Sequence, residues 1–361
     1  MLNSIKDFIK NFQGYKTNRK LVVFLVDDYG TIRIASSEAL TELEKNDNTV
    51  ADNRFNKFDD IASKEDLEML FNVLKSVKDK NGHSAIFTPV TVVANPDFKA
   101  IEESGFKNYF YENFYQTLDK REDGIEIKNL WKQGIQEGIF LPEFHGREHL
   151  NVRFWMNHLR DNDQNIVSAF QNNSIGINPK NKTSYDYMAA YDLIEQNHIE
   201  ELNQITKEGL DIFENLFGYR SVLFTPSALI HHDDMHTELK KQGIEYIDMA
   251  RSRLMPNYKG TKTKKYHYLG QTNNLNQKYI TRNVMFEPNG DFNAVTNALN
   301  AIDVAFKYNK PAIVSSHRVN FVGGKDILNR ENGLKDLKAL LDAIVKKWPD
   351  VEFVPIRDIF K

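Results

Sequence analysis

Residues 21–30 read LVVFLVDDYG: six apolar residues, then two aspartates, a tyrosine and a glycine. A continuous apolar run of this kind is typical of a strand that is buried on both faces of a parallel sheet. Ligands and catalytic groups collect where such strands end, which is where Asp27 and Asp28 lie. Taken alone, an Asp-Asp pair more often caps a helix or faces solvent in a turn, so the pair needs support from the rest of the chain.

Six more short apolar runs alternate with longer amphipathic stretches, which predicts βα units around a parallel sheet. Ser63 and Asp66 form a helix-start pattern, and Gly82 is the expected helix end. We expect one α/β domain over 1–361, with an insertion around 160–215 and a long loop around 251–280, because both regions are polar and break the rhythm. The expected strands are 21–26, 85–89, 139–144, 221–225, 245–248, 312–315 and 351–354.

Composition narrows the possible function classes. The 361 residues include 47 basic and 50 acidic residues, scattered along the chain with a net charge of -3, which argues against nucleic acid as a partner. The chain has no cysteine, so imidazole, carboxylate and water remain as metal ligands. The first twenty residues lack the apolar core of a signal peptide, and no later run has the roughly 18 apolar residues of a membrane span. These features predict a cytoplasmic protein without a transmembrane segment.

A second candidate group, FHGREH at 144–149, directly follows a predicted strand. If the chain turns helical here, the i, i+4 spacing puts His145 and His149 on one face about 5 to 6 Å apart, which suits a metal ion. Because the whole chain has only ten histidines, this pairing after a strand is not easily accidental.

The same residues also read H-x-x-E-H, an inverted zinc-peptidase motif. In that alternative Glu148 activates water, and Glu195 or Glu200 supplies a third ligand from a later helix. Pro142 and Gly146 disfavour the continuous helix that this alternative requires.

His317 follows a third apolar run, so three strands deliver candidate groups to one edge of the predicted sheet. A single histidine there is more often a packing residue, but its recurrence at the same strand end makes it a candidate catalytic acid. The stretch His231-His232-Asp233-Asp234 also follows a predicted strand and could line the same pocket. Tyr29 and Trp155 could stack on a sugar ring, although core packing is the commoner fate of such side chains.

With these positions assembled, the chain resembles the polysaccharide deacetylase family, the NodB-like carbohydrate esterases, over most of its length. Residues 26–30, VDDYG, are similar to the first motif of that family, which implies that Asp27 is the catalytic base and Asp28 a metal ligand. The second motif matches His145 and His149 as the other ligands, and the last motif matches His317 as general acid. The resemblance implies a distorted (β/α)7 barrel with helical and loop insertions.

The third motif of the family differs in this chain. The family has an arginine and a Pro-Tyr where this chain reads FTPS at 224–227. Arg220 or Arg251 could instead orient Asp27, and Asp248 could stand for the aspartate of the fourth motif.

The expected function is therefore a metal-dependent hydrolase that uses metal-activated water to remove an N- or O-linked acetyl group from a sugar or glycan precursor. One divalent ion is expected, Zn²⁺ by default, with Co²⁺, Ni²⁺, Mn²⁺ and Fe²⁺ also compatible. The expected substrate contacts are Tyr29, Trp155, Asp248 and Arg251. Two alternatives stay open: a zinc metallopeptidase that uses Glu148, and a catalytically silent barrel that binds glycan. The oligomeric state is not predicted.

Overall fold

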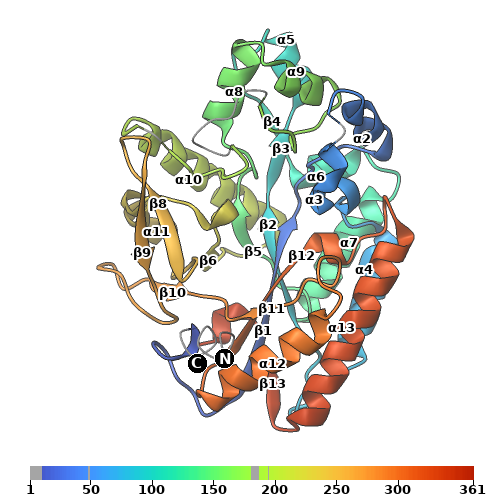
Figure 1. Cartoon of the computed structure of the whole chain (residues 1–361), viewed down its shortest axis with the longest axis vertical. Coiled ribbons are helices and arrows are strands. Elements are labelled where there is room, and N and C mark those ends of the chain that lie inside the picture. The colour runs from blue at the N-terminus through green and yellow to red at the C-terminus, as the bar shows by residue number, and fades with distance from the viewer. Residues whose placement is uncertain (1–9, 48, 180–186, 194) are drawn as a thin grey trace.

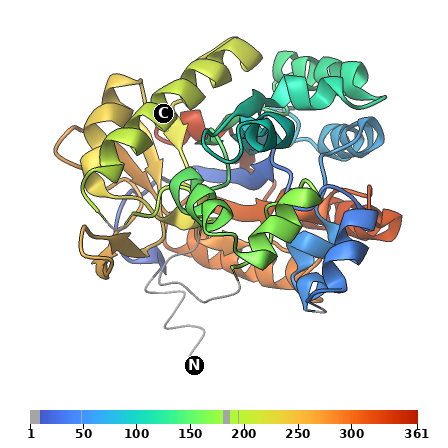
Figure 2. The same cartoon turned by 90° about the horizontal axis from the view of Figure 1, so that it is seen from above.

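The computed structural model describes residues 10–47, 49–179, 187–193 and 195–361. In this part of the chain, nine strands form one parallel sheet with the order β10-β7-β6-β5-β2-β1-β12-β11, and β13 also pairs with β1. The sheet curls into a distorted, incompletely closed barrel with helices outside it (Figures 1 and 2). The α/β fold expected from the sequence is thus confirmed. The strands are β1 (Lys20–Tyr29), β2 (Phe87–Val92), β5 (Glu143–Gly146), β6 (Leu223–Phe224), β7 (Tyr246–Asp248), β10 (Lys278–Ile280), β11 (Val284–Met285), β12 (Ala312–His317) and β13 (Val351–Phe353).

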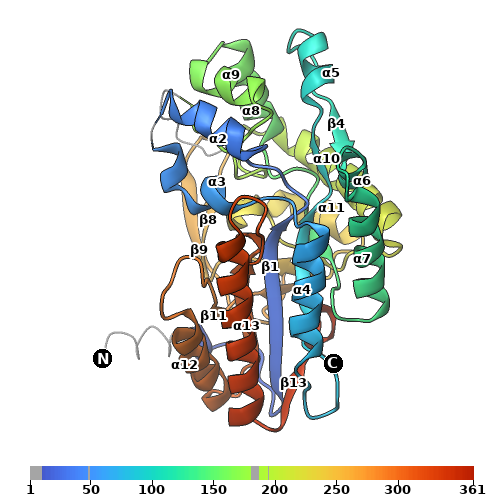
Figure 3. The same ribbon diagram turned by 90° about the vertical axis from the view of Figure 1, so that its right-hand side faces the viewer.

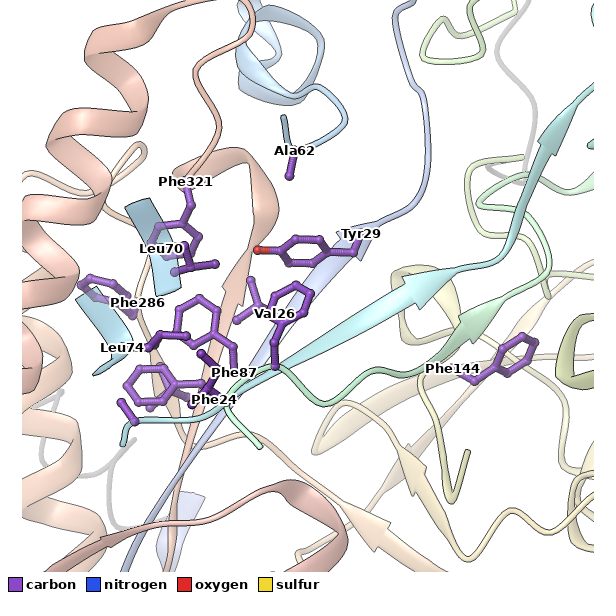
Figure 4. Packing of buried hydrophobic residues seen from close by; sticks show 14 of the residues in the cluster. Phe24, Val26, Tyr29, Ala62, Leu70, Leu74, Phe87, Phe144, Phe286 and Phe321 are labelled. Carbon is purple, nitrogen blue, oxygen red and sulfur yellow. The ribbon is translucent and has the colours of Figure 1, made fainter. Parts of the chain in front are cut away.

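Alternate side chains of β1 build two different cores. Val23 and Leu25 lie in the cluster inside the curled sheet, which Ile356 and Ile359 also join. Phe24 and its outward-facing neighbours pack instead against the helices, where Figure 4 shows Phe24 and Val26 beside Leu70, Leu74 and Phe87. Because successive strand residues face opposite sides, a strand buried on both faces must be apolar throughout, as residues 21–26 are.

Four helices lie side by side against the outer face of β1, in the order α12, α13, α4 and α7 (Figure 3). Helix α4 begins with the predicted capping box of Ser63 and Asp66, but it ends at Lys75 rather than near Gly82, which lies in a later turn with φ of 79°. The helices are α2 (Ser37–Glu44), α3 (Arg54–Phe58), α4 (Lys64–Lys75), α5 (Phe98–Glu103), α6 (Phe114–Asp119), α7 (Gly124–Gln136), α8 (Val152–Arg160), α9 (Gln164–Gln171), α10 (His198–Phe217), α11 (His236–Lys241), α12 (Ala294–Lys307) and α13 (Ile327–Lys347).

The regions that break the βα rhythm contain structure of their own. The predicted loop around 251–280 holds a hairpin of β8 (Ser252–Pro256) and β9 (Lys262–Tyr266), followed by β10. The predicted insertion around 160–215 contains α9 and most of α10, while 180–186 and 194 lie outside the described residues. A second hairpin joins β3 (Ala94–Pro96) and β4 (Tyr111–Asn113). Among the described residues, no helix combines the length and apolarity needed to cross a membrane.

The two edges of the sheet are joined by only three residues. Strands β10 and β11 stand at opposite ends of the strand order, yet residues 281–283 connect them directly. We call this connection the seam. The chain itself therefore brings the two edges together and places the side chain of Arg282 between them.

Candidate active site

An irregularity at the end of β1 turns two neighbouring carboxylates toward one cavity. The register between β1 and β2 shifts between Val26 and Tyr29, and Asp28 has a left-handed backbone with φ of 73°. Asp27 and Asp28 consequently line the same cavity, although consecutive residues of a regular strand face opposite sides. A left-handed non-glycine residue costs on the order of 1–2 kcal/mol, and such strain is concentrated at functional sites.

Asp28, His145 and His149 converge from the ends of two strands. His145 lies on β5, and His149 lies in the bend between β5 and α8. The Nε2 atoms of His145 and His149 lie 3.5 Å and 3.3 Å from Oδ1 of Asp28. The structure thus brings the three predicted ligands together. His145 and His149 do not lie on one helix, however, so the expected i, i+4 spacing is not what pairs them. The backbone of β5 is extended and Gly146 has φ of 142°.

This donor set fits a tetrahedral divalent ion. Donor atoms at 2.0–2.1 Å from such an ion lie roughly 3.3 Å from one another, which is close to the two distances above. Nδ1 of His145 donates a hydrogen bond to the carbonyl oxygen of Thr225 at 2.7 Å, so the lone pair of Nε2 faces Asp28. Metal-binding histidines commonly have this arrangement. Burial, and then the charge of Arg33, lower the pKa of His149, which favours the neutral imidazole that a ligand requires.

Arg33 lies beside the candidate ligands and was not predicted. Its Nη2 is 3.1 Å from Oδ2 of Asp28, which leaves Oδ1 for the histidines. Burial alone would raise the pKa of Asp28, but Arg33 and hydrogen bonds from the two imidazoles hold it well below its usual value. The guanidinium group packs over the ring of Phe55 at 4.7 Å.

Arg282, in the seam, holds the other carboxylate. Its Nη1 and Nη2 donate to the two oxygens of Asp27 at 2.7 Å and 2.8 Å. Its Nε and Nη2 donate to Oδ2 of Asp248 at 2.8 Å and 2.6 Å. Burial alone would lower the pKa of Arg282, but the two carboxylates raise it. Arg282 therefore fixes Asp27 in one orientation at the edge of the cavity.

His317 stands across the cavity from the metal-ligand group, at the end of β12. Its Nε2 lies 3.9 Å from Oδ2 of Asp27, and its Nδ1 lies 2.6 Å from Oε1 of Glu287. Burial alone would lower the pKa of His317, but the hydrogen bond to Glu287 and the charges of nearby carboxylates raise it above the usual value. Glu287 is itself held by Arg54 at 2.6 Å. His317 is thus an oriented imidazole that holds a proton to higher pH than an exposed histidine.

These groups line one cavity of about 410 Å³, a size typical of small-molecule sites. Ala228 and Leu229, in the loop after β6, line it with two consecutive left-handed backbones, φ 55° and 54°. Among the described residues, no Trp or Tyr lines it. The apolar lining residues are Phe55, Met188, Pro226, Ala228, Leu229 and Met285.

The two expected aromatic substrate contacts lie in the core instead. Tyr29 is 2% exposed, and its ring packs edge-on against Trp131 and Phe140. Trp155 is fully buried and packs against Phe170 in the cluster around α8 and α9. Both predictions were wrong because the two rings pack against other aromatic side chains in the core, which is the commoner position of such side chains.

The arginines suggested as partners of Asp27 lie elsewhere. Arg220 binds Asp211 at 2.8 Å, and Arg251 does not line the cavity. Asp248 is fully buried, binds Arg282 and Thr225, and does not line the cavity. The structure therefore gives no support to Asp248 and Arg251 as substrate contacts.

The peptidase alternative is not supported by the geometry. His145 lies on a strand, whereas H-x-x-E-H catalysis needs both histidines on one helix. Oε1 of Glu148 binds Nε of Arg147 at 2.6 Å, and Glu148 does not line the cavity. Glu195 binds Arg153 at 2.9 Å.

Three residues of the site were not predicted, and for two of them the sequence contains a pattern that could have identified them. Glu287 directly follows the apolar run 284–286, so the strand-end rule that selected His317 also selects Glu287. Arg282 interrupts the run YITRNVMF at 279–286, where an apolar context makes a lone cation conspicuous. Arg33 has no comparable pattern around it.

No protein-family model matches the chain, and no curated protein matches it. Solved structures that match include a probable polysaccharide deacetylase from Pseudomonas aeruginosa PAO1, with 10% identity, 95% of this chain and 90% of that chain covered, and a TM-score of 0.48. Puue allantoinase matches with 10% identity, 96% and 90% coverage, and a TM-score of 0.48. The 4-alpha-glucanotransferase from Thermococcus litoralis matches with 9% identity and a TM-score of 0.46 over 94% of this chain, which spans only 40% of that protein. Chains described as a CE4 family pseudoenzyme also match. These are likenesses of fold, and at such identities and TM-scores they say nothing about activity.

Proposed function

We propose that this protein is a metal-dependent hydrolase that removes an acyl group, with an acetylated sugar or glycan precursor as the first substrate class to test. One observation carries the proposal. The possible ligands Asp28, His145 and His149 share one cavity with an oriented carboxylate, Asp27, and an oriented imidazole, His317.

Asp28, His145 and His149 would hold the ion, for which zinc is the first choice. When bound, a divalent ion in such a site polarises an acyl carbonyl and lowers the pKa of water. Other residues of the chain orient these ligands. The carbonyl oxygen of Thr225 fixes the ring of His145, and Arg33 fixes Asp28.

Asp27 and His317 are the proton-transfer groups. Arg282 occupies one lone pair on each oxygen of Asp27, which leaves others to accept a proton from the attacking water. His317 carries a proton on Nε2 when Glu287 holds Nδ1–H, and it donates that proton to the departing amine or alkoxide. His317 faces Asp27 at 3.9 Å, so base and acid flank the same small volume.

The test pairs metal analysis with an acetate-release screen on acetylated sugars. We expect about one divalent ion per chain, lost in Asp28→Ala and His145→Ala, and acetate release that Asp27→Asn lowers by about 10²–10⁴-fold while the ion is retained. His83→Ala and Asp119→Asn are the matched controls, since both side chains are exposed and lie outside the cavity.

Retention of the ion in both ligand variants would contradict the proposed site. Sugar binding without acetate release, under every metal tried, would contradict the proposed activity and favour the glycan-binding alternative. Release that depends on Glu148 and not on Asp27 would favour the peptidase alternative.

A further inference from the structure

A second polar cluster lies at the other end of the loop that lines the active cavity. This loop begins with Thr225 and continues into the stretch HHDD at 231–234. These residues were expected to line the same pocket, but they face the hairpin of β8 and β9 instead. We call them, with residues that contact them, the hairpin cluster: His231, His232, Asp233, Asp234, His236, Arg253, Lys265 and His267.

Three members of the hairpin cluster could in principle bind a metal ion. Donor atoms of His231, Asp233 and His236 lie within 4.8 Å of one another. A guanidinium group already fills that role, however, because Arg253 lies with Nη1 3.0 Å from Nε2 of His231 and with Nη2 against Asp233. The Nζ of Lys265 lies 2.5 Å from the other oxygen of Asp233. A divalent cation would add charge where two cations already share one carboxylate, which is unfavourable at low dielectric constant.

The two cations of the hairpin cluster, Arg253 and Lys265, share the single carboxylate of Asp233, while Asp234 lies beside His232. Arg253 is fully buried, and buried charges are ordinarily paired. Within the described residues, Nε of Arg253 and Nδ1 of His231 have no hydrogen-bond partner. The sequence around the hairpin is basic, since between Asp248 and Glu287 the chain has eight Arg and Lys residues and no acidic residue. Some of these cations pair with carboxylates of other segments, as Lys262 does with Asp192 at 2.7 Å, and the stretch itself carries a net positive charge.

A cavity of about 510 Å³ opens onto this charge. Lys265 and His267 line it from the hairpin side, His236 lines it from α11, and Asn273 and Asn274 line it from the turn before β10. Asp233 also lines it, with its two oxygens on Arg253 and Lys265. Burial, and then the charge of Arg253, lower the pKa of His267 to about 4. We propose that this cavity binds an oxyanion, the phosphate or carboxylate group of a ligand, through Lys265, His236 and His267, with Arg253 as the charge behind them. This inference does not depend on the proposed hydrolase activity.

The inference is tested by isothermal titration calorimetry, in which inorganic phosphate is added to the full-length protein. We expect saturable binding that Lys265→Met and His267→Gln each weaken at least about tenfold, on the scale of a hydrogen bond to a charged group. Lys264→Met is the matched control, because Lys264 neighbours Lys265 on β9, is exposed and faces the other side of the hairpin. The pKa of His267, followed by NMR, should rise when phosphate binds.

Three results would overturn the inference: no phosphate binding to the wild-type protein, equal losses in Lys264→Met and Lys265→Met, or a second equivalent of Co²⁺ that His236→Ala removes. Binding that disappears in His145→Ala would likewise assign the phosphate to the active cavity. If acetate release is found, phosphate competition with the substrate would assign the oxyanion to the substrate, and an effect on kcat alone would assign it to a separate ligand. Melting temperatures of the variants confirm that they are folded.

Discussion

Arg282 is the residue on which two buried carboxylates depend. Asp27 lines the cavity, whereas Asp248 lies behind it and is fully buried. Burial raises the pKa of Asp248 even though Arg282 opposes this effect. Removal of one partner from such a buried group costs about 3–5 kcal/mol, because the remaining charge has no compensation.

Substitution of Arg282 should therefore affect stability and activity separately. We expect Arg282→Met to lower the free energy of unfolding by about 3–5 kcal/mol and to lower kcat because Asp27 is released. The double variant Arg282→Met with Asp248→Asn should recover part of the stability but none of the activity. Denaturant unfolding and kinetics on the same samples measure both. Recovery of kcat together with stability would show that Arg282 does not position Asp27.

Glu287 should set the basic limb of the pH profile. Because it raises the pKa of His317, the protonated acid persists to higher pH in the wild-type protein, and activity is lost as pH rises through that pKa. Glu287→Gln removes the negative charge, so the basic limb should move to lower pH. A pH–kcat profile measures the shift. An unmoved limb would mean that another group is the acid. Asp291→Asn is the control, because Asp291 accepts hydrogen bonds from Asn293 and Asn297.

At the scale of single residues, the sequence predicted those groups that end long, apolar strands. Asp27, Asp28, His145 and His317 were selected in this way, and all four line one cavity. Arg282 and Glu287 were missed because β10 and β11 have three and two residues, too short for a periodic pattern. The burial of Tyr29 and Trp155 depends on contacts between distant segments, which one sequence does not display.

At the scale of elements, the position of β5 depends on its packing against α10. A Cβ atom added to Gly209 would lie 2.7 Å from Cζ of Phe144 and 3.0 Å from Cβ of Arg147. Phe144 and Arg147 flank the segment that carries His145. Glycine here permits the close approach of helix and strand that places the ligand.

Gly209→Ala should therefore damage the metal site from a distance. We expect a loss of about 1–3 kcal/mol in stability from overpacking and weaker metal binding, because β5 must move. Lys207→Ala, exposed on the same helix, should change stability by no more than about 0.5 kcal/mol and leave metal binding intact. Competition with a chromophoric chelator measures the affinity. Unchanged affinity in Gly209→Ala would show that the helix can yield instead of the strand.

Some boundaries of helices and strands were predicted from the sequence and others were not, depending on whether a short sequence pattern marks them. The start of α4 was found because the Ser63–Asp66 capping box is a local pattern. Its end was misplaced because Ser76 caps the helix without a glycine. Strand β5 begins later than expected, since residues 139–142 contact β2 only through an isolated bridge at Phe140.

At the scale of the whole molecule, a bound ion should stabilise the fold, because the ligands come from β1, β5 and the bend after β5. Binding to the folded state alone adds about 2.7 kcal/mol at a metal concentration of 100 Kd. We expect zinc to raise the melting temperature by several degrees and a chelator to reverse the rise. Calorimetry should show no such effect in Asp28→Ala. A rise of equal size in that variant would place the ion elsewhere.

The curled parallel sheet could be predicted because alternating apolar and amphipathic runs leave few other architectures. Its manner of closure could not, because nothing in the sequence separates a loop from a connection that joins two sheet edges. Residues 251–280 were expected to be one loop, yet they end in an edge strand.

The seam at 281–283 also constrains how the chain can be cut. Permutation succeeds at exposed turns with few contacts, and the seam does not meet that condition, because Asn283 is buried and Arg282 is held by two carboxylates. A cut in the seam would instead free both edges and let Arg282 leave its two carboxylates. New termini in the seam should therefore disturb the fold and the candidate active site together, because these three residues both join the sheet edges and carry the arginine that holds Asp27.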